Sequence, residues 1–155
     1  MRSYNCPVQD ALLGTAANNT PWHLAGAANI RLLLQEFVFG PRASADTIVN
    51  FSIARSTNAS SVATGTPLVE AQTDETATQA ASAVGTSGAK GTAYTTGPSF
   101  GNILHPVGLH QRATYRWVAQ PNREIMTAAV ATAGLALKVE AVVAFNADFM
   151  GSWDE

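Results

Sequence analysis

The sequence predicts an all-β protein, an antiparallel β-sandwich of jelly-roll type with at most one short helix. Branched and aromatic side chains are concentrated in short segments, and several of these segments alternate apolar and polar residues with the period of a strand. The segments follow one another at the short spacing that is typical of sandwiches and barrels. About seven strands are expected.

The first strong strand is expected over residues 29–39, which are rich in branched and aromatic side chains and end at Gly40-Pro41, a stop for regular structure. Simple alternation places apolar side chains on both faces of this strand. One face would carry Ile30, Leu32, Leu34 and Val38, and the other would carry Leu33, Phe37 and Phe39. A strand of this kind needs cover on both sides.

Residues 47–55 alternate more cleanly and predict a half-buried strand. Thr47, Val49, Phe51 and Ile53 share one face, and Asn50 and Ser52 share the other. The polar stretch 56–70 predicts a long loop, and Asp74 could cap a short helix within residues 71–84. A turn cluster follows at 85–92.

The remaining strands are expected at 92–96, 100–105, 112–119, 123–127 and 135–146. The last of them alternates from Leu135 to Phe145, with Lys138 and Glu140 on the opposite face. Gln120-Pro121-Asn122-Arg123 has the chemistry of a turn and predicts a hairpin-like connection between its neighbours.

Composition excludes several classes of protein. The 155 residues carry a formal net charge of −2 with only 13% charged side chains, so neither a nucleic-acid partner nor a disordered chain is expected. The single Cys6 cannot form an internal disulfide, and no apolar run approaches the eighteen or so residues that span a membrane. The first residues lack the apolar region of a secretory signal, so synthesis and retention in a cytoplasm are expected.

No motif predicts catalysis, a metal or a cofactor. In Gly85–Thr92 a glycine separates Lys90 from Thr92, whereas a phosphate loop needs the lysine and hydroxyl residue adjacent. His23, His105 and His110 lack the spacing of a zinc site, and His105 and His110 are interpreted as loop histidines. No serine lies in a nucleophile-elbow motif. Paired acids for glycoside hydrolysis, or a sugar platform of aromatic residues, remain open alternatives.

The order of the segments resembles a known family. The relevant stretches are residues 24–39, the strand Val-x-Phe-Ser-Ile-Ala-Arg-Ser-Thr, the loop around Thr66-Pro67-Leu68, residues 111–119 and residues 133–137. Together they resemble the small virion proteins of tailed bacteriophages that decorate or cement the capsid as trimeric β-sandwiches. The resemblance covers roughly residues 20–147. It implies no enzyme activity and no cofactor, a location on the phage particle, and the major capsid protein as partner.

These observations predict a three-part organisation: an N-terminal docking arm over residues 1–27, a sandwich over 28–148 and a tail over 149–155. The two-sided apolar strand favours self-association, most simply as a homotrimer. Residues expected at the capsid or subunit interface are Leu12, Leu13, Trp22, Leu33, Phe37 and Phe39. The alternative function is a receptor-binding or glycan-binding module of a phage fibre or tail.

Overall fold

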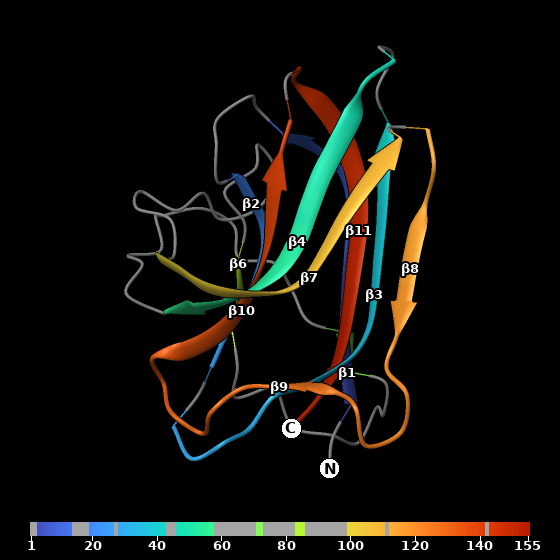
Figure 1. Cartoon of the computed structure of the whole chain (residues 1–155). Helices are drawn as coiled ribbons and strands as arrows, with labels where there is room; N and C mark the ends of the chain where they lie inside the picture. Colours follow the sequence, from blue (N-terminus) through green and yellow to red (C-terminus); the bar gives the residue numbers. More distant parts are fainter. Residues whose placement is uncertain are drawn as a thin grey trace.

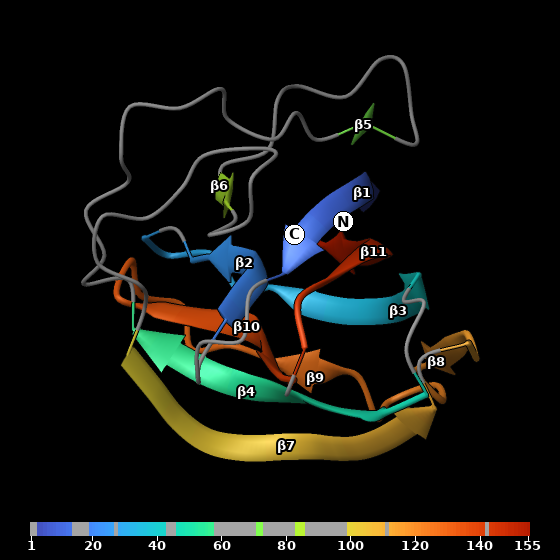
Figure 2. The same ribbon diagram turned by 90° about the horizontal axis from the view of Figure 1, so that it is seen from above.

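The protein is an all-β sandwich. The computed structural model describes residues 3–13, 19–26, 28–42, 46–57, 71–72, 83–85, 99–110, 112–141 and 143–155, and this part of the chain contains no helix. Two antiparallel sheets pack face to face (Figures 1 and 2). The strands are β1 (Ser3–Leu13), β2 (Asn19–Ala25), β3 (Leu33–Arg42), β4 (Ile48–Thr57), β5 (Ala71–Gln72), β6 (Ala83–Gly85), β7 (Ser99–His110), β8 (Tyr115–Val118), β9 (Ile125–Met126), β10 (Ala133–Glu140) and β11 (Phe145–Asp154).

The topology is that of a jelly roll, which confirms the predicted fold class. Sheet 1 has the order β5-β1-β11-β3-β8, with β9 also paired to β3, and sheet 2 has the order β6-β2-β10-β4-β7. The eight longest strands form four antiparallel pairs, β1 with β11, β2 with β10, β3 with β8 and β4 with β7. This arrangement is a ribbon of strand pairs rolled up until β11 meets β3 and β10 meets β4.

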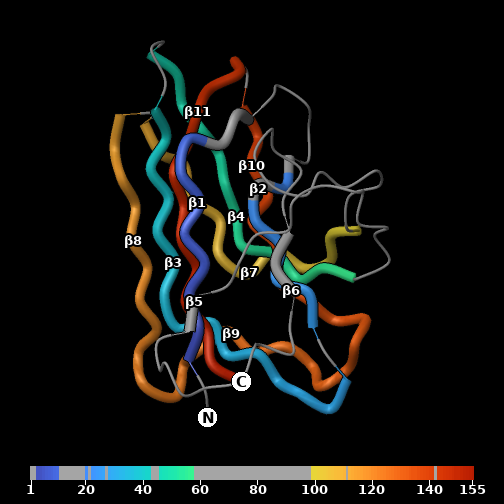
Figure 3. The backbone as a smooth tube through the Cα atoms, turned by 180° about the vertical axis from the view of Figure 1, so that it is seen from behind, coloured from blue at the N-terminus to red at the C-terminus, as the bar shows by residue number. Residues whose placement is uncertain are grey.

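The predicted docking arm and C-terminal tail are wrong, because both segments are strands of the sandwich. β1 pairs with β11 from Ser3↔Asp154 to Leu13↔Phe145, and β2 pairs with β10. Figure 3 shows β1 and β11 side by side, with the two ends of the chain close together at the base. The apolar side chains of both terminal strands belong to the core between the sheets.

The expected division of the apolar residues of β3 between its two faces is also wrong, and a β-bulge is the reason. In the β3–β11 ladder Ser152 pairs with Glu36, but the next residue, Trp153, pairs with Leu34, so Gln35 is an extra residue. An extra residue reverses the in–out alternation beyond it. Leu32, Leu34, Phe37 and Phe39 therefore face the core together and are fully buried, whereas Leu33 and Val38 are only partly buried.

A short hydrogen-bond network holds this bulge at the base of the molecule. The Gln35 amide nitrogen donates to one carboxylate oxygen of Asp154 at 2.9 Å, and the Ser3 hydroxyl donates to the other at 2.5 Å. Asp154 is nearly buried. One carboxylate thus joins the first strand, the last strand and the bulge of the strand between β11 and β8.

Two predicted interruptions of the strands, at Gly40-Pro41 and at Gln120–Arg123, differ from the structure. β3 continues through Gly40-Pro41 to Arg42, with Pro41 opposite Ala147. The neighbour of β3 on its other side, β8, pairs with it only as far as Phe39, so the missing N–H of Pro41 costs no hydrogen bond there.

The turn at Gln120–Arg123 forms, with the Arg123 N–H donating to the Gln120 carbonyl at 2.9 Å. It does not form a hairpin, because β8 and β9 both pair with β3.

The predicted strand 135–146 is two strands. β10 ends at Glu140 and β11 begins at Phe145, although the alternation of side chains continues across the break. β5 and β6 lie at the two ends of residues 71–84, and the short helix that Asp74 could cap falls on residues 73–82, outside the described residues. The expected strand 92–96, most of the loop 56–70 and most of the turn cluster 85–92 are also outside them.

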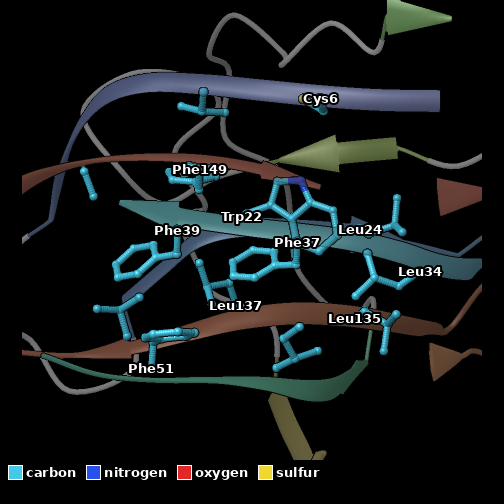
Figure 4. Close-up of a cluster of buried hydrophobic side chains, with 14 of the residues drawn as sticks. Cys6, Trp22, Leu24, Leu34, Phe37, Phe39, Phe51, Leu135, Leu137 and Phe149 are labelled. Carbon is cyan, nitrogen blue, oxygen red and sulfur yellow. The ribbon is translucent and has the colours of Figure 1, made fainter. Parts of the chain in front are cut away.

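The core between the sheets is a connected row of aromatic rings. Tyr4 stacks on Trp153 with ring centroids 5.9 Å apart, and Trp153 and Phe37 both contact Trp22, at 6.5 and 6.2 Å. Phe51 continues the row from sheet 2, 4.8 Å from Phe39. Figure 4 shows the rings of Trp22, Phe37, Phe39 and Phe51, with Leu135 and Leu137 of β10 beside them. The core is therefore built from both sheets and from both ends of the chain.

Candidate docking face

The predicted interface residues do not form a surface. Trp22, Phe37 and Phe39 are 0% exposed and lie in the core, so they cannot contact a partner in this fold. Leu33 lies opposite Met126 and is partly buried. Leu12 and Leu13 are in β1, but their side chains are outside the described part of the structure. The apolar residues of a strand predict burial, but the sequence does not say whether the cover comes from the same chain or another.

The outer face of sheet 2 offers a different surface, built from two rows of residues across three strands. In the first row Glu140 of β10, Asn50 of β4 and Gly108 of β7 are neighbours. In the second row Lys138, Ser52 and Pro106 are neighbours in the same order. The flanking residues Val49, Phe51 and Ile53 point into the core, so these six residues point outward, as the alternation of residues 47–55 predicted for Asn50 and Ser52.

These six residues form the floor of an open groove of about 280 Å³, called the outer groove below. Because β7 contributes Gly108 and Pro106 to the floor, no long side chain rises from the sheet on that side of the groove. Ile103 lines one end of the groove. Ile48 lies beside the groove near Gly108, because its Cγ2 atom is 3.9 Å from where a Cβ on Gly108 would be. Ile48 is 65% exposed and Ile103 55% exposed, the two largest values among the exposed large apolar side chains of the described residues.

The charged side chains around the outer groove are paired with one another. Lys138 Nζ lies 2.5 Å from Glu140 Oε1, and its ammonium also lies 5.9 Å from the centre of the Phe100 ring. Near Ile48, His110 Nε2 is 3.1 Å from Asp46 Oδ1. The lining of the groove therefore presents the Ile103 side chain and the Asn50 amide, with its lysine paired to its glutamate.

Sequence reasoning missed this surface, although a signal for it existed. Ile48 is separated from Asn50 and Ser52 by an even number of positions, so its side chain belongs to the same, polar face of the strand. An apolar side chain on a solvent-facing side is the kind of exception that marks an interaction site. The position of Ile103 could not be read in the same way, because the β4–β7 register shifts on both sides of Ala54.

The three histidines occupy three different environments. His105 and His110 belong to β7 rather than to a loop, which corrects their sequence interpretation. Being five residues apart in a strand, they lie on opposite faces. His105 Nε2 is 2.5 Å from the Tyr115 hydroxyl, and this contact joins the edges of the two sheets.

Within the described ranges no group of three or more His, Cys, Asp or Glu side chains could hold a metal ion. The same ranges contain no helix that is long and apolar enough to cross a membrane.

His23 forms a buried pair with a hydroxyl. Its Nε2 atom is 2.9 Å from Ser56 Oγ, and the two side chains are 0% and 5% exposed. Imidazole and hydroxyl are the first two members of a catalytic triad. Here both residues lie within strands and are closed to solvent, so a substrate cannot reach the hydroxyl. The hydrogen bond joins β2 to β4, the two strands that flank β10 in sheet 2.

This burial predicts acid lability. Desolvation lowers the pKa of His23 from 6.5 to about 4, so the folded protein holds it neutral while the unfolded chain protonates it below pH 6.5. Stability is therefore complete above pH 6.5 and falls between pH 6.5 and 4, by on the order of 3 kcal/mol from this group. Urea unfolding at pH 7 and pH 4.5 measures the loss. His23→Gln should reduce the difference between the two pH values, whereas His110→Gln, on the exposed His110, should leave it unchanged. An equal loss in all three proteins would contradict the assignment.

Comparisons with known proteins give no relative. No family model matches the chain, and neither a curated protein nor a solved structure matches it significantly. What is known of this protein's chemistry therefore comes from its own residues.

Proposed function

We propose that the protein is a non-enzymatic virion structural protein of a tailed bacteriophage, which binds the capsid surface and stabilises it as a decoration protein. In this proposal it is made in the cytoplasm of the bacterial host, needs no cofactor and binds the major capsid protein as a homotrimer. The order of segments in the sequence resembles such proteins. The jelly roll is also used by many viral capsid and lectin domains, which supports the proposal only by analogy.

The observation that carries the proposal is the outer face of sheet 2. It exposes Ile103 in the lining of a groove and Ile48 beside it, and the two charged groups that line the groove, Lys138 and Glu140, are paired. A face of this kind suits contact with another protein surface, because apolar burial drives association and no charge is left unpaired. By contrast, two of the three tryptophans that could have formed a sugar platform, Trp22 and Trp153, are in the core.

Co-sedimentation with capsids tests the proposal. The full chain is mixed with undecorated capsids of the phage that encodes it and centrifuged, and the pelleted protein is measured against its concentration. We expect saturable binding at a fixed number of copies per capsid, and light scattering of the free protein should give the mass of a trimer. Protein that stays in the supernatant at every concentration would overturn the proposal. Binding on a glycan array together with no capsid binding would favour the receptor-binding alternative.

A further inference from the structure

We draw no further inference here: the strongest candidate, the open groove of about 310 Å³ that Pro7, Val38 and Met150 line on the outer face of sheet 1, is an apolar surface over β1, β3 and β11, and nothing in the structure shows what covers it.

Discussion

Removing residues 1–13 should unfold the protein. β1 pairs with β11 at nine positions, and it buries Tyr4, Cys6 and Val8 against the core. Burying one large apolar side chain contributes about 1.5–3 kcal/mol, and a domain of this size is stable by only about 5–15 kcal/mol. Loss of the strand also leaves β11 with an unpaired edge along its length. Circular dichroism and limited proteolysis of the truncated chain should show no cooperative melting and rapid cleavage.

Two point variants of β1 separate this role from a general effect of truncation. Cys6→Asp places a carboxylate at a fully buried position and should destabilise the fold as strongly as a core cavity, by more than ~3 kcal/mol. Asn5→Asp changes the adjacent residue, whose side chain points to the opposite face and is partly exposed, and should cost less than ~1 kcal/mol. A truncated chain that melts cooperatively would instead restore the docking arm expected from the sequence.

The second large effect is expected at Gly151 on β11. A Cβ there would lie 2.5 Å from Cζ2 and 2.9 Å from Cε2 of the Trp22 ring, closer than real Cβ atoms approach. Trp22 is fully buried between Phe37 and Trp153, so the ring has nowhere to move. Gly151→Ala should therefore cost about 3 kcal/mol or more, at the upper end of the cost of overpacking a core. Urea denaturation gives the free energy directly.

Gly40→Ala is the matched control, since its new Cβ would meet Thr114 Oγ1 at 3.4 Å, an ordinary contact. It should change the free energy of unfolding by less than ~1 kcal/mol. The cause of the effect at Gly151 is tested by adding Trp22→Leu, which removes the ring. Trp22→Leu should cost less in the Gly151→Ala background than alone, with a coupling free energy of about 1–3 kcal/mol. Additive costs would show that the two positions do not collide.

The sequence by itself determined the fold class and the faces of its simplest strands. Residues 49–53 alternate apolar and polar side chains, and the structure buries Val49, Phe51 and Ile53 while Asn50 faces outward. The same holds for Tyr115 and Trp117 against Arg116. The reason is that a strand's side chains alternate with a period of two, so an unbroken pattern shows which residues share a face.

Only the tertiary structure decided which segments meet and which apolar residues are covered by the same chain. The pairing of β1 with β11 joins opposite ends of the sequence, and nothing local to either strand specifies its partner. The bulge at Gln35 reverses the alternation within one strand, and its position depends on Asp154, more than a hundred residues away. The outer groove needs β10, β4 and β7 side by side. A period-two pattern holds no information on register between distant strands, because register is set by the contacts that form when the sheets pack.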